Sequence, residues 1–182
     1  MKKCFFLCRS FTGHGIGSWD ISSVTDMSQC FVGCTVFDAD IGAWDTSSVT
    51  NMAHMFAGHG KTMAFNADVS AWDTSSVKDM SYMFESCVRF DQPIGTWDTS
   101  SVKSMEAMFA GMRGLTHRFN KDIGRWDTSA VADMCEMFAW SLFDHDITAW
   151  DTSSAMDMDR MFEGTTMNLA HIPAGAPPPT MP

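Results

Sequence analysis

Cysteine is the residue whose spacing most directly suggests chemistry in this sequence. Cys4 and Cys8 are four residues apart, and Cys30 and Cys34 repeat the same Cys-x3-Cys spacing. Two such pairs on neighbouring segments have the spacing of a zinc site, or of disulfides between the segments. Methionine takes the place of Cys4 and Cys30 in the related segments described below, which favours buried thiols that act as small hydrophobic residues. We favour the thiols, and the disulfides and zinc remain alternatives.

Aspartate forms the second candidate site, because it follows Trp at six regularly spaced positions: Asp20, Asp45, Asp73, Asp98, Asp127 and Asp151. A second acidic set precedes the Trp residues: Asp38, Asp40, Asp68, Asp122, Asp144 and Asp146. Carboxylates can bind calcium, which takes about six to eight oxygen ligands. None of these segments has a glycine-rich calcium loop. We therefore favour an interpretation in which each Asp accepts hydrogen bonds from backbone N–H groups of the following Thr-Ser-Ser turn.

Neither the threonines nor the histidines form a recognisable catalytic arrangement. A Thr follows five of the six Trp-Asp pairs, and these residues stand in a single column rather than in the flat array of an ice-binding surface. We expect Thr99→Ala to cost about 1 kcal/mol or less. The six histidines fall at different repeat positions, so no nucleophile–base pair can be assembled from their spacing. The sequence predicts a protein without enzymatic activity or cofactor.

These candidate residues all lie within one repeated unit. Trp-Asp occurs at Trp19, Trp44, Trp72, Trp97, Trp126 and Trp150, with intervals of 25, 28, 25, 29 and 24 residues. Each Trp is followed by Phe at an interval of twelve residues, and this interval never varies. A period in this range is typical of a solenoid, in which each unit buries its apolar residues against its neighbours.

Length varies only between the two Phe residues of each unit, where the intervals are 6, 9, 6, 10 and 5 residues. Insertions of this kind mark a surface loop on one side of a stack. The two longest intervals carry Lys61, Arg113 and Arg118, and Trp140 is the single Trp outside the Trp-Asp positions. We predict that these four residues form a contact surface for an acidic or glycan-bearing macromolecule, although the insertions can also be merely tolerated surface loops.

The boundaries follow from the same alignment. Residues 1–5 match residues 27–31, so the chain begins inside a unit, and residues 1–18 form a truncated repeat rather than a signal peptide. Six full coils start near residues 19, 44, 72, 97, 126 and 150, which gives one domain over residues 1–172. Residues 173–182 are rich in Pro and are predicted to be a disordered tail.

Composition excludes several partners. The net charge of −10 argues against nucleic acid, which requires a basic face. No apolar run approaches the roughly 20 residues that a transmembrane helix needs.

The spacing of apolar residues predicts the secondary structure of a unit. Ile41 and Trp44 are predicted to lie in a brief strand, and Val49, Met52 and Phe56 in a helical or 3₁₀ turn.

The consensus F-[ND]-x-D-I-G-x-W-D-T-S-S-V-x-D-M-S-x-M-F resembles the repeat of the BspA-like, or DUF285, surface proteins, which include mycoplasma lipoproteins. The resemblance implies a leucine-rich-repeat-like solenoid and a secreted or cell-surface protein that binds other macromolecules, with no catalytic residue to carry over. We therefore expect a scaffold for protein–protein or cell-surface interaction. The alternative is a structural repeat protein stabilised by calcium or zinc.

Overall fold

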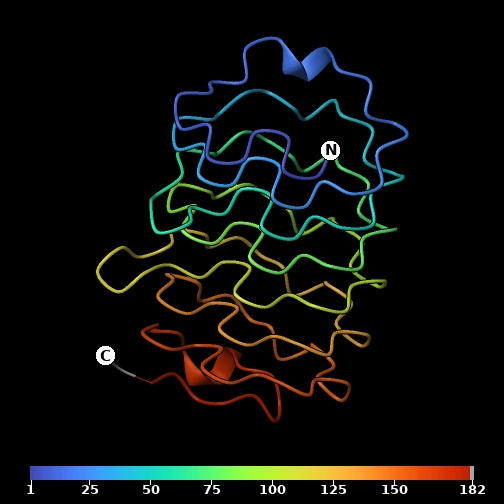
Figure 1. The fold of residues 1–182 in the computed structure, drawn as a ribbon. Helices are drawn as coiled ribbons and strands as arrows, with labels where there is room; N and C mark the ends of the chain where they lie inside the picture. The colour runs from blue at the N-terminus through green and yellow to red at the C-terminus, as the bar shows by residue number, and fades with distance from the viewer. Residues whose placement is uncertain (181–182) are drawn as a thin grey trace.

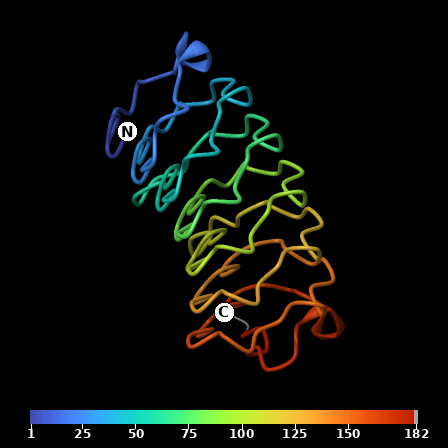
Figure 2. The ribbon, with the colours of Figure 1, turned by 90° about the vertical axis from the view of Figure 1, so that its right-hand side faces the viewer.

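A repeat unit is defined here as the segment that begins at one of the six Trp-Asp pairs. In the computed structural model, which describes residues 1–180, these units lie one above another in chain order, from the blue end to the red end of the ribbon (Figure 1). The side view separates the successive units along the long direction of the molecule (Figure 2). Parallel bridges join the residue seven positions after each Trp to its counterpart in the next unit: Asp26–Asn51, Asn51–Asp79, Asp79–Ser104, Ser104–Asp133 and Asp133–Asp157.

The predicted leucine-rich-repeat-like solenoid of short strands and helical turns is wrong. Residues 1–180 contain no named strand and no sheet, only isolated bridges. Their regular elements are two 3₁₀ helices, η1 (Ile16–Ser18) and η2 (Leu169–His171). The remaining backbone forms turns and irregular segments, so the segment around Ile41 and Trp44 is not a strand.

A repeated left-handed residue explains why neither a strand nor a helix forms. The residue ten positions after each Trp has φ between 49° and 58°, although none of these residues is Gly: Gln29, His54, Tyr82, Ala107, Glu136 and Arg160. Such a backbone conformation interrupts an extended strand and a right-handed helix alike, and costs about 1–2 kcal/mol for a residue with a Cβ.

Hydrogen bonds between units offset this cost. From the eighth to the fourteenth residue after Trp, every second N–H donates to a carbonyl of the next unit, as His54 N does to Ser81 O (2.7 Å). N–H groups at the intervening positions close local turns, as Met55 N does to Met52 O (3.1 Å). The backbone is therefore satisfied by turns within each unit and by a ladder along the stack, rather than by a sheet.

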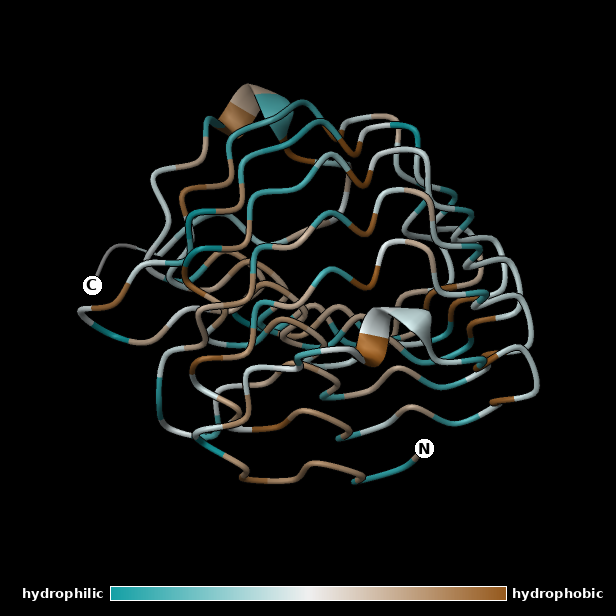
Figure 3. Cartoon of the chain, turned by 90° about the horizontal axis from the view of Figure 1, so that it is seen from above, coloured by the Kyte–Doolittle hydropathy of each residue, from teal (hydrophilic) through white to brown (hydrophobic). Residues whose placement is uncertain are grey.

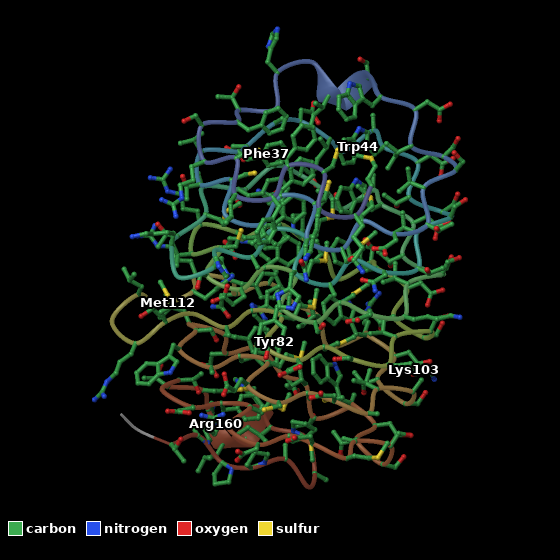
Figure 4. All side chains as sticks on the ribbon, viewed as in Figure 1. Phe37, Trp44, Tyr82, Lys103, Met112 and Arg160 are labelled. Atoms are coloured by element: carbon green, nitrogen blue, oxygen red, sulfur yellow. The ribbon has the colours of Figure 1, made fainter. Side chains whose placement is uncertain are left out.

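Aromatic side chains fill the interior in register. In the five units that have two Phe residues, the two rings stack at 3.8–4.2 Å between centroids, as Phe84 and Phe90 do at 3.8 Å. The first Phe of one unit lies 5.6–5.9 Å from the first Phe of the next, and the second Phe residues are 5.7–6.1 Å apart. Phe37 and Trp44 lie inside the outline of the molecule in Figure 4. Viewed along the stack, the chain encloses a shared interior (Figure 3).

The Trp column is held by hydrogen bonds as well as by packing. Each indole N–H from Trp44 onward donates to the carbonyl three residues before the preceding Trp, as Trp97 Nε1 does to Val69 O (3.1 Å). The rings stack at 6.3–6.4 Å between centroids. Trp19, at the end of the column, is 43% exposed. The predicted Trp core is thus confirmed for five of the six repeat Trp residues.

The Thr column is part of this interior. Thr46, Thr74, Thr99 and Thr128 are each 1% exposed, and each hydroxyl donates to the carbonyl of the Asp that follows Trp in the next unit (2.9 Å). Because the hydroxyl satisfies a carbonyl of the neighbouring unit, these threonines tie the units together and leave no exposed Thr array.

The described part of the Pro-rich segment, residues 173–180, packs against the last unit, whereas the sequence predicts a disordered tail over residues 173–182. Thr152 Oγ1 donates to Ala174 O (2.8 Å), and Gly164 N donates to Thr180 O (2.8 Å). Pro173 is buried and Ala176 contacts the core. Ala174 O therefore takes the place that the Asp carbonyl of a next unit holds elsewhere. Met181 and Pro182 lie outside the described residues.

Substitutions in the Trp97 unit test this interior. Trp97→Ala is expected to cost about 3–5 kcal/mol, because it removes a stacked ring and leaves Val69 O without its donor. Thr99→Ala is expected to cost about 1–3 kcal/mol, more than its sequence suggests, because Asp127 O loses its hydroxyl partner. The exposed Thr96→Ala serves as a control at about 0.5 kcal/mol or less. Urea denaturation gives all three values, and equal losses for Trp97→Ala and Thr96→Ala would contradict a Trp core.

Candidate functional site

The aspartates that follow Trp stabilise turns, as the sequence suggests. Each accepts the N–H of the Ser two residues later, as Asp45 does from Ser47 N (3.1 Å), and five of the six also accept that Ser hydroxyl. The Ser47 hydroxyl and N–H hold the pKa of Asp45 below its usual range. Because these oxygens already accept internal hydrogen bonds, the column is explained as a set of turn caps.

A second column links the units through alternating acids and amides. Its members directly follow the second Phe of each unit or occupy the equivalent position: Asp38, Asn66, Asp91, Asn120, Asp144 and Asn168. Each side-chain oxygen accepts the backbone N–H of the next member, as Asp91 does from Asn120 N (3.0 Å). Since every second member is an uncharged amide, no two carboxylates of this column lie on adjacent units, which reduces their repulsion.

The four N-terminal cysteines lie in two registered pairs. Residues 3–7 donate hydrogen bonds to residues 28–32, as Phe5 N does to Cys30 O (2.8 Å), so Cys4 lies beside Cys30 and Cys8 beside Cys34. All four are free thiols, with Cys30 and Cys34 buried and Cys4 and Cys8 exposed. Burial is the main cause that raises the pKa of Cys30 to about 12, and the neighbouring Cys4 thiol adds to the increase. Within residues 1–180 no three His, Cys, Asp or Glu side chains converge as a metal-binding set.

The first insertion turns back toward the core. Lys61 N donates to Gly58 O (3.1 Å) to close a turn, and Gly60 there has φ 76°. Met63, which follows the turn, is 1% exposed, so only His59, Gly60 and Lys61 lie fully at the surface. The insertion thus presents one exposed cation, Lys61.

The second insertion forms a tight hairpin. Met112 and Leu115 form an antiparallel bridge, with Arg113 and Gly114 between them, and Gly114 has φ 83°. This loop protrudes at the left margin of the ribbon in yellow, where Met112 is labelled in Figure 4. Arg113 is exposed at the turn, and Leu115 is 46% exposed beside it.

Arg118 lines a surface hollow of about 470 Å³, to which Gly114 and Leu115 of this hairpin also contribute. Arg89, Leu115 and Leu142 line the same hollow, together with Val88, Gly114 and Thr116. Lys61 and Arg113, by contrast, contribute nothing to its wall. The sequence prediction missed Arg89, Leu142 and Val88, because it considered insertions rather than positions of fixed spacing.

One aligned position brings three of these residues together. The residue just before the second Phe of a unit is Arg89, Arg118 and Leu142 in three consecutive units. The adjoining Phe90, Phe119 and Phe143 rings are 6.1 Å apart from one unit to the next. The two arginines and the leucine therefore start from neighbouring positions along the stack, a juxtaposition that the repeat alignment alone could have revealed.

Trp140 packs against the stack and does not stand free. It is half-buried beside the small cluster of Ala107, Ala110 and Ala139. A Cβ atom on Gly164 would lie only 2.5 Å from the Trp140 ring, so Gly at this position makes room for the indole. Trp140 supports the unit that carries Leu142, and it lies outside the wall of the hollow.

His117 supports the second insertion from within. It is fully buried, its Nε2 lies 3.0 Å from Phe84 O, and its Nδ1 accepts Phe119 N (3.2 Å). The neutral ring with a proton on Nε2 satisfies both contacts. Burial lowers the pKa of His117 to about 4. Its backbone also pairs with the Trp140–Leu142 segment, which positions Arg118 next to Leu142.

The comparison with protein families gives one match. The model of a Mycoplasma protein family of unknown function, DUF285, matches residues 1–118 and 111–172. The chain therefore belongs to the DUF285 family, which confirms the resemblance seen in its repeats. The searches of curated proteins and of solved structures find no match. Among residues 1–180 there is no helix with the length and apolar character to cross a bilayer.

The buried His117 makes stability depend on pH. Its folded pKa of about 4 lies below the value of about 6.5 for an unfolded chain, so unfolding takes up a proton and stability falls as pH drops from 6.5 toward 4. Between pH 7.5 and pH 5 the loss is about 2 kcal/mol. His54, whose pKa is also lowered by burial, adds to the same change.

Comparing how much stability the parent and the His117→Gln variant each lose between pH 7.5 and pH 5 isolates the contribution of His117. Urea denaturation at pH 7.5 and at pH 5 is expected to show a smaller loss of stability for the variant, whatever its stability at pH 7.5. An identical loss in both proteins would show that His117 is not buried in the neutral form.

Proposed function

We propose that this chain is a non-enzymatic repeat scaffold that binds another macromolecule, a protein or a glycan, through the edge that carries its two insertions. The observation that carries the proposal is the combination of variable loop length with exposed cations. Lys61, Arg113 and Arg118 all lie in the insertions and are exposed. None of them forms a salt bridge to an acidic side chain within residues 1–180.

The insertions place cations on an otherwise acidic protein. The net charge is −10, so exposed cations that no carboxylate pairs with can attract an acidic partner. Other exposed cations without a salt bridge in residues 1–180, such as Lys78 and Lys103, lie in the Trp-to-Phe segments of constant length rather than in the insertions. The loop backbones are anchored by the stack, which favours a preformed contact surface over one that must order on binding.

Shortening the loops tests the proposal. Deleting residues 59–61 and 112–115 gives both units the six-residue interval found between Phe31 and Phe37 and between Phe84 and Phe90. The fold is checked by circular dichroism and thermal unfolding. On an array of extracellular proteins and glycans, the parent is expected to capture at least one partner, and the shortened variant to bind it at least about tenfold more weakly.

Two further variants complete this experiment. One keeps both loop lengths but replaces residues 59–61 and 112–115 by Gly and Ser, and is expected to lose binding as well. Trp140→Ser tests the indole separately, because its packing on Gly164 gives it a structural role. Equal capture by parent and shortened protein, or no capture by the parent, would contradict the proposal.

A further inference from the structure

Two arginines on adjacent units line the hollow. Arg89 and Arg118 occupy the same aligned position, next to Phe rings 6.1 Å apart, and both are exposed. Like charges at neighbouring positions repel each other, and an anion bound between them relieves this repulsion. Neither arginine forms a salt bridge within residues 1–180. The carboxylate nearest to Arg89 in sequence, Asp91, already binds Lys121 and Asn120 N.

The lining of the hollow also includes apolar side chains. Leu115 is 46% exposed and Leu142 is 52% exposed, which makes them two of the few large apolar side chains at the surface. Leu115 comes from the hairpin of the second insertion, and Leu142 continues the aligned position of the two arginines into the next unit. A volume of about 470 Å³ is large enough for a few side chains of a bound segment.

We propose that this hollow binds a peptide segment in which a carboxylate lies next to an aliphatic side chain. Arg89 and Arg118 hold the carboxylate through paired N–H···O bonds, and Leu115 and Leu142 cover the aliphatic group. A long polyanion such as nucleic acid fits less well, because the rest of the surface repels it. A glycan without an acidic group leaves both guanidinium groups without a partner. This proposal rests on the proposed function and names the chemistry of its partner.

The sequence provides a direct probe, since it contains only four leucines: Leu7, Leu115, Leu142 and Leu169. Leu115 and Leu142 line the hollow, while Leu7 and Leu169 do not and serve as internal controls. The whole chain, labelled with ¹³C at leucine methyl groups, is titrated with a short blocked peptide in which aspartate and leucine alternate. The methyl signals of Leu115 and Leu142 are expected to shift, and those of Leu7 and Leu169 to stay in place.

Matched variants and peptides separate the site from general charge. The Arg89→Gln/Arg118→Gln protein is expected to bind the peptide at least about tenfold more weakly. The Lys78→Gln/Lys103→Gln protein has the same change in net charge at two exposed residues outside the hollow, and it is expected to stay within about twofold of the parent. An asparagine–leucine peptide is expected to bind at least about tenfold more weakly than the aspartate–leucine peptide.

Several outcomes would overturn the proposal: no shift at Leu115 and Leu142, equal shifts at all four leucines, equal weakening in both double variants, or equal binding of the two peptides.

The array experiment that tests the proposed function can fail independently of this peptide titration. A parent that captures a partner through its loops, yet shows unmoved Leu115 and Leu142 signals with the aspartate–leucine peptide, contradicts only the peptide chemistry assigned to the hollow.

Discussion

The hydrogen bond from each of five repeat indole N–H groups to the carbonyl three residues before the preceding repeat Trp constrains the rest of the structure. It couples the position of one Trp to the backbone three residues before the previous Trp, and successive rings stack at 6.3–6.4 Å. The stacked Phe pairs must keep the same register, so the interval from Trp to Phe cannot change without breaking both columns. Length can vary only between the two Phe residues, and this restricts insertions to one edge of the molecule.

The repeat alignment predicts which side chains are buried, because stacking gives equivalent positions equivalent surroundings. It identifies the Trp, Phe and Met core and the role of Asp45 and its equivalents as turn caps. It does not predict the backbone, since the left-handed position is occupied by residues such as His54, Tyr82 and Glu136, whose local preferences disfavour that conformation. Only the ladder between units stabilises it. The packing of residues 173–180 was missed for a similar reason, because Ala174 contributes a carbonyl rather than a characteristic side chain.

The candidate site was only partly predictable. Arg118 is visible in the sequence as part of an insertion, and the structure places it in the hollow with Leu115. Arg89 belongs to a unit without an insertion, so only its alignment with Arg118 and Leu142 reveals the site. Trp140 is the one Trp outside the Trp-Asp positions, which makes it a candidate contact residue in the sequence, but its contact with Gly164 gives it a role in packing. Residues that repeat in every unit form the interior of this DUF285 protein, and the candidate site is formed at positions where neighbouring units carry different residues.

Hydrogen–deuterium exchange of the indole N–H groups, followed by ¹H–¹⁵N spectroscopy, tests the Trp column most directly. The seven tryptophans divide into two groups: Trp44, Trp72, Trp97, Trp126 and Trp150 donate to carbonyls of preceding units, whereas Trp19 and Trp140 have no such bond within residues 1–180. The five bonded indoles are expected to exchange only on unfolding of the stack, and Trp19 and Trp140 to exchange much faster. Exchange of Trp72, Trp97 and Trp126 as fast as that of Trp19 would contradict the account.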